Sequence, residues 1–201
     1  MEMVCITGGI GSGKSVVSRV LRLKGYEVYD CDSRAKELMD ASETLKCELE
    51  KRAGVTLRSA DGCIDRRRMA EVLFGDDSFR RFANGMIHSM VRDDIRGRLG
   101  ESESGILFVE TAIPVTSGLD RMADGIWLVD APEDVRIDRV MRRNGVTAQS
   151  VAGRIRTQHG EFDSLPATRT SVIRNYGSHS LLLQIDRYLE SVLHRSSSGK
   201  A

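Results

Sequence analysis

A glycine-rich turn near the amino terminus constrains this chain more than any other feature of its sequence. The apolar run Met3-Val4-Cys5-Ile6 leads into Gly8-Gly9-Ile10-Gly11-Ser12-Gly13-Lys14-Ser15. This stretch matches the pattern of glycine, four residues of any kind, then Gly-Lys-Ser, which joins a buried strand to a helix. Glycines let the backbone curl round an anion, so that successive N–H groups and a helix N-terminus point at a phosphate chain. We therefore expect a nucleoside triphosphate to bind here.

Two side chains of this turn have the chemistry to act on a bound triphosphate. Lys14 carries a cation for the β- and γ-phosphates, and the Ser15 hydroxyl is a ligand for Mg²⁺. The backbone of five further residues is expected to bind the nucleotide: Gly9, Ile10, Gly11, Ser12 and Gly13. ATP and Mg²⁺ are the expected ligands, with the choice among triphosphates left open. A plain strand-to-helix reversal with an exposed lysine is the alternative, but the flanking strand and helix patterns favour the phosphate site.

Composition limits the remaining possibilities. The chain has 201 residues, 40% of them hydrophobic, and a net charge of +1. This suffices for one sizeable core with a smaller lobe, and it gives no general argument for a nucleic-acid partner. No apolar run approaches the roughly 18 residues of a membrane span, and no leader pattern is present, so we expect neither a membrane segment nor export. The four cysteines form no Cys-x-x-Cys pair, which predicts reduced thiols in a cytoplasmic protein.

The order of apolar and helical patterns predicts an α/β fold. Short apolar runs predict strands at Met3–Ile6, Glu27–Asp30, Ile106–Val109, Ile126–Val129 and Ser171–Ile173. Helices are expected from Ser15 to Lys24, from an N-cap at Ser33, from Pro132 to about Arg143, from a cap at Thr147 to about His159, and from Leu181 to Leu193. Strands alternating with helices after a phosphate loop predict a three-layer P-loop NTPase fold around a five-stranded parallel sheet.

Long helical patterns interrupt this alternation once. Residues 42–99 are helical and charged, with a turn signal at Asp61-Gly62, so we expect an inserted helical lobe over residues 33–99. The nucleotide-binding core then comprises residues 1–32 and 100–195, with a lid at about 136–160. Residues 196–201 are expected to form a disordered tail. Nothing in the sequence indicates the oligomeric state.

Polar residues follow the predicted strands, and the carboxyl ends of parallel strands gather the ligands in such folds. Asp30 and Asp32 follow the second strand, Glu110 ends the third, and Asn175 follows the fifth. A kinase needs a carboxylate to orient or deprotonate the attacking hydroxyl. Asp30 and Asp32 are both candidates from position alone. Glu110 is a candidate for holding magnesium through water or for assisting the base, and an ordinary exposed acid at a strand end is the equal alternative.

Arginines are concentrated in the predicted lid. From Arg136 to Arg174 the chain has eight arginines and three acids. Arg136, Arg139 and Arg143 recur at spacings of three and four, which places them on one helical face. Guanidinium groups make bidentate contacts to phosphate, so this face is expected to clamp the triphosphate. A solvated basic face is the alternative for any single arginine.

These motifs together resemble the dephospho-coenzyme A kinase family over nearly the whole chain. The stretch from Thr7 to Ser15 has the form of the family's nucleotide loop, including its Thr-Gly-Gly-Ile opening. The stretch from Tyr29 to Ala35 resembles its Asp-x-Asp element, Ile87-His88 falls where the family has a His-Pro pair, and Val172–Gly177 resembles the stretch that borders the adenine. The segments Asp61–Phe74 and Trp127–Glu133, with Arg139 and Arg143, match its acceptor lobe and its lid helix.

The resemblance assigns roles to particular residues. Asp32 is implied as the catalytic base, Lys14 and Arg139 as catalytic cations, Arg143 and Asn175 as nucleotide contacts, and His88 and Glu110 as acceptor contacts beside Asp32. It implies phosphorylation of the 3′-hydroxyl of dephospho-coenzyme A by ATP, the final step of coenzyme A synthesis. The helical lobe is then the acceptor site.

Three departures from the family pattern bear on the acceptor. Ser89 follows His88 where the family has proline, and Glu110–Thr116 replaces a Pro-Leu-Leu-Phe-Glu segment, so that Thr116 stands where that segment ends in an acid. Residues 167–171 replace an Ala-Asp pair. Two alternatives therefore stay open: a P-loop kinase for another nucleoside, nucleotide or small alcohol, and a nucleotide-binding regulator without kinase activity.

Overall fold

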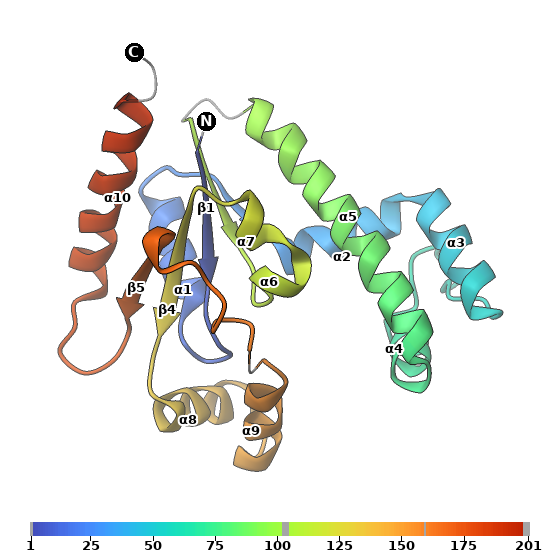
Figure 1. Cartoon of the computed structure of the whole chain (residues 1–201). Coiled ribbons are helices and arrows are strands. Elements are labelled where there is room, and N and C mark those ends of the chain that lie inside the picture. The colour runs from blue at the N-terminus through green and yellow to red at the C-terminus, as the bar shows by residue number, and fades with distance from the viewer. Residues whose placement is uncertain (1, 102–104, 159, 199–201) are drawn as a thin grey trace. The chain divides into compact units, whose positions relative to one another are not determined.

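The computed structural model describes residues 2–101, 105–158 and 160–198, drawn in Figure 1. The chain divides into two compact units. One unit comprises Met1–Asp30 and Arg98–Ala201, and the other comprises Cys31–Gly97. The second unit is thus an insertion between the second and third strands of the first.

A five-stranded sheet forms the centre of the first unit. The strands β1 (Glu2–Thr7), β2 (Val28–Asp30), β3 (Ile106–Glu110), β4 (Gly125–Asp130) and β5 (Thr170–Arg174) lie in the order β2-β3-β1-β4-β5. Every neighbouring pair is parallel. The predicted all-parallel sheet is therefore confirmed. The central strands β1, β3 and β4 are apolar runs without alternation because both faces of such a sheet are covered.

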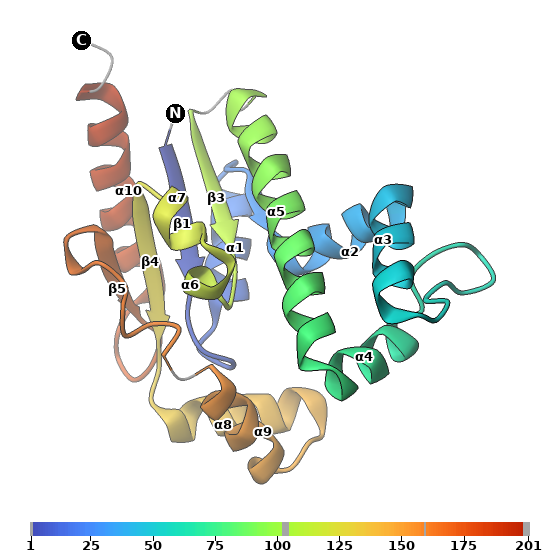
Figure 2. The same cartoon turned by 45° about the vertical axis from the view of Figure 1, so that its right-hand side comes forward.

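Helices cover both faces of this sheet. On one face, α1 (Lys14–Leu23) and α10 (Leu181–Ser198) pack side chains such as Leu21 and Ile185 onto Phe108 and Trp127. The short helices α6 (Pro114–Ser117) and α7 (Leu119–Met122) lie over the opposite face (Figures 1 and 2). The helices α8 (Glu133–Asn144) and α9 (Ala148–Thr157) form a hairpin beyond the carboxyl ends of the strands. This end of the sheet is where the phosphate loop emerges.

Helix boundaries depart from the sequence expectations at two places. The helix α2 begins at Cys31 directly after β2, so Ser33 lies inside its first turn and is not the N-cap. The buried Cys31 side chain accompanies this earlier start, and tertiary burial overrides a local capping signal. At the other end α10 continues to Ser198, so residues 196–198 are helical rather than tail, since extending a formed helix costs little. Residues 199–201 and His159 lie outside the described residues. The predicted cap at Thr147 is confirmed, because its side-chain oxygen accepts from the Ser150 N–H.

The second unit is helical. It contains α2 (Cys31–Ala41), α3 (Glu43–Ala53), α4 (Arg66–Gly75) and most of α5 (Asp77–Glu101). Its own core includes Leu49, Leu57 and Phe79, each fully buried. Arg34 on α2 donates to both carboxylate oxygens of Asp94 on α5, at 2.9 and 3.0 Å. A bidentate pair of this kind fixes geometry as well as adding energy.

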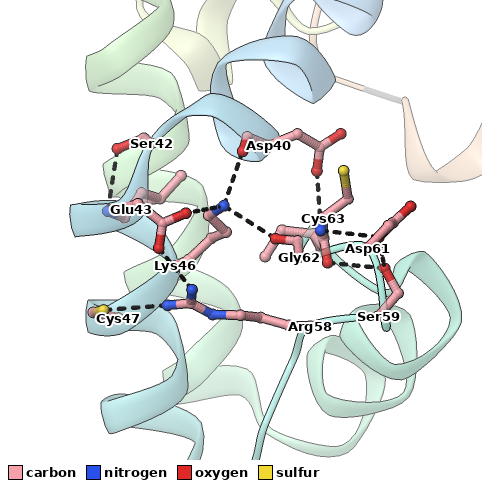
Figure 3. A network of polar contacts seen from close by, with 12 residues as sticks. Asp40, Ser42, Glu43, Lys46, Cys47, Arg58, Ser59, Asp61, Gly62 and Cys63 are labelled. Carbon is pink, nitrogen blue, oxygen red and sulfur yellow. Dashed lines mark hydrogen bonds and ion pairs between the residues drawn. The ribbon is translucent and has the colours of Figure 1, made fainter.

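A buried lysine fastens the loop between α3 and α4. The Lys46 side chain is 4% exposed, and its ammonium donates to the carbonyl oxygens of Asp40 at 2.9 Å and Gly62 at 3.1 Å. It also pairs with Glu43, which in turn pairs with Arg58 at 2.6 Å (Figure 3). These two bonds, Lys46 first, hold the pKa of Glu43 below its ordinary value. The network holds the turn that the sequence marked at Asp61-Gly62.

Candidate active site

The phosphate loop connects β1 to α1 at the carboxyl edge of the sheet. Lys14 is the first residue of α1, and its ammonium donates to the Gly8 carbonyl oxygen at 2.6 Å. Gly13 precedes it with φ 106°, in the left-handed region that suits glycine. A Cβ added there would lie 2.0 Å from the Asn175 side-chain nitrogen. Glycine is therefore required at this position by conformation and by close approach.

Asn175 and Arg139 hold the loop from the side of β5. The Asn175 side-chain amide donates to the Ser12 carbonyl at 2.7 Å, and its backbone N–H donates to the Asp130 carbonyl at 2.8 Å. Arg139 on α8 donates to the Asn175 carbonyl at 2.7 Å and more weakly to the Gly11 and Ser12 carbonyls, both at 3.4 Å. The structure thus brings together Lys14, the loop, Arg139 and Asn175, four elements expected separately from the sequence.

The α8–α9 hairpin contacts the tip of the same loop. Ile10 packs against a small apolar cluster of the hairpin, formed by Val140, Val151 and Ile155. The Ile10 N–H donates to the side-chain carbonyl of Gln158 at 2.8 Å. Arg136 lies so close that a Cβ on Gly9 would be 1.9 Å from one of its terminal nitrogens. The predicted lid therefore bears directly on the phosphate loop in this structure.

Carboxylates line the neighbouring strand ends. Asp30 and Glu110 are register partners at the ends of β2 and β3, and Glu110 is also the partner of Ile6 in β1. Both side chains are half-buried. Asp32 is exposed in the first turn of α2, two residues beyond the end of β2. Asp32 belongs to the second unit.

Other predicted residues lie apart from this cluster. Arg143 is exposed, and in the described part of the chain its guanidinium bonds only to the adjacent Asn144, at 3.0 Å. His88 is half-buried on α5 in the second unit. Ser15 follows Lys14 in the first turn of α1, and it is exposed.

Metal chemistry at this site rests on few protein donors. Within residues 2–101, 105–158 and 160–198, no group of three His, Cys, Asp or Glu side chains is placed to hold an ion. Mg²⁺ in nucleotide sites is bound mainly by phosphates and water with one or two hard oxygen donors from the protein. The Ser15 hydroxyl and the carboxylates at the strand ends are donors of that type. The donor set therefore fits Mg²⁺ carried by a nucleotide.

Two contacts of the site could not be found from the sequence. Gln158 lies at the end of a predicted helix, and 148 positions separate it from Ile10. Glu161 accepts hydrogen bonds from the backbone of α6, 45 and 46 positions away. Neither residue stands in a motif. Only the folded arrangement of the hairpin reveals them.

A phosphate loop at the carboxyl edge of a parallel sheet, held by an arginine-bearing hairpin and flanked by strand-end carboxylates, defines a P-loop phosphotransferase of the kinase type. Known proteins agree with this class. The model of the family described as dephospho-CoA kinase matches residues 2–180. The chain therefore belongs to the dephospho-CoA kinase family.

Individual relatives extend over almost the full chain. The dephospho-CoA kinase of Porphyromonas gingivalis is 38% identical over 192 residues, covering 96% of this chain and 95% of that protein. The dephospho-CoA kinase of Bacteroides fragilis is 33% identical, with 97% and 96% covered. A crystal structure from Thermus thermophilus is 31% identical with a TM-score of 0.77, covering 96% and 97%. The dephospho-CoA kinase of Campylobacter jejuni, 19% identical with a TM-score of 0.67 and coverage of 99% and 100%, shares the fold.

Membrane insertion by a helix has no support in the structure. None of the helices in the described ranges combines the length and the apolar character that a span needs.

Proposed function

We propose that this chain transfers the γ-phosphoryl group of ATP to the 3′-hydroxyl of dephospho-coenzyme A, giving coenzyme A. One observation carries the proposal: a phosphate loop braced by Arg139 and Asn175 lies in a chain whose match to the dephospho-CoA kinase family spans residues 2–180. The family match supports dephospho-coenzyme A as the acceptor, and the phosphate loop supports phosphoryl transfer as the reaction. The reaction is the last step of coenzyme A synthesis.

Lys14 is the cation for the transferred phosphoryl group. Its ammonium rests on the Gly8 carbonyl in this structure, so binding replaces that carbonyl by phosphate oxygens. Phosphoryl transfer is catalysed mainly by positioning and by neutralising charge on the phosphoryl oxygens. We expect Lys14→Met to lower kcat strongly, because methionine keeps the length of the side chain and removes the charge.

The arginines of α8 are proposed to have different roles. Arg139 donates to backbone carbonyls of the loop and of Asn175, so we assign it to bracing the loop and bordering the nucleotide. Arg136 lies against Gly9, at the tip of the loop, where a guanidinium can reach phosphate oxygens. Arg143, exposed at the far end of α8, is a nucleotide contact only if the hairpin moves on binding.

Asp32 is proposed as the base that orients the 3′-hydroxyl and accepts its proton. Asp32 is exposed in the first turn of α2, directly after β2. Asp30, two residues before Asp32 in the chain, is the register partner of Glu110 at the strand ends. Mg²⁺, when bound with ATP, supplies charge neutralisation at the phosphates. Ser15 is the residue proposed to hold it, with Glu110 acting through water.

The second unit is proposed as the acceptor lobe. It has its own apolar core, and it carries His88 as the proposed acceptor contact. All four cysteines are free thiols, which suits the reducing environment of the cytoplasm, the proposed location of the enzyme.

A different acceptor is the second candidate. The observation that favours it is the α6 segment, where Pro114 and Thr116 stand in the stretch that departs from the family pattern. ADP release measured with Mg-ATP, with and without dephospho-coenzyme A, separates the two. Release stimulated by dephospho-coenzyme A, with a product heavier by one phosphoryl group, supports the proposal. Demonstrable ATP binding without such stimulation refutes it and directs the search to other hydroxyl compounds.

A further inference from the structure

Glu161 makes an unusual contact in the first unit. Its side chain is 9% exposed, and in the described part of the chain it forms no ion pair. A carboxylate buried without a cation is costly unless hydrogen-bond donors replace the lost water. Glu161 has three such donors, and all of them belong to α6.

The donors lie at the start of α6. One carboxylate oxygen of Glu161 accepts from the Val115 N–H at 3.1 Å and from the Thr116 N–H at 3.3 Å. The other oxygen accepts a short hydrogen bond from the Thr116 hydroxyl. The first N–H groups of a helix have no partner within the helix, so Glu161 satisfies donors that the chain leaves open. The contact is therefore a cap supplied from 45 positions further along the chain.

This cap joins two parts of the site. Glu161 lies three positions after Gln158, which accepts from the Ile10 N–H of the phosphate loop. The segment it caps begins at Glu110, the last residue of β3, and is ordered by a bond from the Ile113 N–H to the Thr111 hydroxyl at 3.2 Å. The chain after α9 thus contacts the nucleotide loop at one point and the segment after β3 at another.

We propose that Glu161 is a positioning residue for the acceptor: its carboxylate fixes the segment from Glu110 to Ser117 and thereby the acceptor side of the site. The inference rests on the proposed function, because it takes that segment to border the acceptor. Thr116 is its partner. The carboxylate at the start of α6 is the side chain of Glu161, which lies outside the segment from Glu110 to Ser117.

A conservative variant provides a rescue. Glu161→Gln keeps one side-chain oxygen that can accept from the Val115 and Thr116 N–H groups, and its amide can donate to the Thr116 hydroxyl. The variant therefore keeps the cap of α6 and removes only the negative charge.

The test compares acceptor and donor parameters in the full-length protein. For Glu161→Ala we expect the KM for dephospho-coenzyme A to rise about tenfold, the loss of one charge-assisted hydrogen bond. The Kd for ATP, measured by calorimetry, is expected to stay within about twofold. Thr116→Val, which removes only the hydroxyl, shifts the acceptor KM in the same direction by less, and it remains informative if Glu161→Ala does not fold. Glu161→Gln, which keeps an acceptor for both N–H groups, is expected to retain most of the acceptor affinity that Glu161→Ala loses.

Hydrogen exchange provides a readout that needs no turnover. The Val115 and Thr116 N–H groups are expected to exchange faster in Glu161→Ala, while the Ile10 N–H is unaffected. An unchanged acceptor KM in Glu161→Ala, an equal rise in the ATP Kd, or an acceptor KM in Glu161→Gln as high as in Glu161→Ala each overturns the inference. Absence of phosphoryl transfer by the unsubstituted protein refutes the proposed function itself, and this outcome is distinct because it is seen before any variant is compared.

Discussion

The side-chain carbonyl of Gln158 accepts a hydrogen bond from the Ile10 N–H at 2.8 Å, which connects the end of the α8–α9 hairpin to the tip of the phosphate loop. The Ile10 side chain packs into the same hairpin. The loop is therefore held in shape by the lid before any nucleotide arrives. A loop ordered in advance loses less conformational freedom on binding, and this favours affinity.

Gln158→Leu tests this bracing role. The substitution keeps the size of the side chain and removes the acceptor, so we expect the Kd for ATP to rise about threefold to tenfold, as for one neutral hydrogen bond. Calorimetric titration measures it. Gln149→Leu, at an exposed position of the same helix α9, is the matched control and is expected to change nothing. A Kd that falls in Gln158→Leu would show that Gln158 competes with the nucleotide instead.

Asp32→Asn separates chemistry from binding. An amide cannot accept the hydroxyl proton, so we expect kcat to fall about a hundredfold or more, the range for general base catalysis. The Kd for ATP is expected to change little, because Asp32 lies in α2, outside the loop. Asp30→Asn, two residues earlier, is the matched control. If Asp30→Asn loses turnover and Asp32→Asn does not, the base has been assigned to the wrong aspartate.

The buried thiol of Cys5 makes the free energy of unfolding depend on pH in the alkaline range. Burial, with a smaller effect of Asp120, raises the pKa of Cys5 to about 12, against 9.0 for the ordinary thiol. The raised value means that the unfolded chain loses this proton first. The contribution of Cys5 to the free energy of unfolding is therefore fully present below about pH 9. It is lost as the pH rises toward 12, by at most about 1.4 kcal/mol per pH unit.

Urea unfolding of the protein and of Cys5→Ala across this pH range measures the effect. We expect the variant to lose the part of the pH slope that belongs to Cys5. Cys47→Ala, which removes an exposed thiol, is expected to keep it. Identical slopes in the protein and in Cys5→Ala would disprove the assignment to Cys5.

Lys46→Met tests the network of the second unit. Methionine fills the space but leaves the Asp40 and Gly62 carbonyls without their donor, so the free energy of unfolding is expected to fall by about 1–3 kcal/mol. Denaturant unfolding monitored in the second unit measures it. Lys51→Met, an exposed lysine on the same helix α3, is the control and is expected to be neutral. Equal stability of the two variants would mean that the network adds nothing.

The sequence predicts the sheet and the phosphate loop well because their signals are local. Apolar runs without alternation locate the central strands β1, β3 and β4, and the loop motif fixes the strand before it and the helix after it. The cap at Thr147 is found for the same reason. Where burial competes with a local signal, as at Cys31 and Ser33, the boundary is predicted wrongly by two residues.

The contacts made by the residues that follow α9 could not be predicted. Gln158 and Glu161 are polar residues without a motif, and each finds its partner only when the hairpin folds back onto the sheet. Arg139 donates to three backbone carbonyls in this structure, and its role as a catalytic cation stays a prediction. Helical spacing shows that arginines share a face, but it does not show which atoms that face meets. The roles of Asp32, His88 and Arg143 stay predictions.

The position of the transferred phosphoryl group tests the central claim most directly. Dephospho-coenzyme A is incubated with Mg-ATP and the protein, and the product is analysed by phosphorus NMR with correlation to the ribose protons. The account predicts a new phosphate monoester coupled to the proton on the ribose 3′-carbon. A phosphate on any other oxygen, or no ester formed while ATP binding is intact, would contradict it.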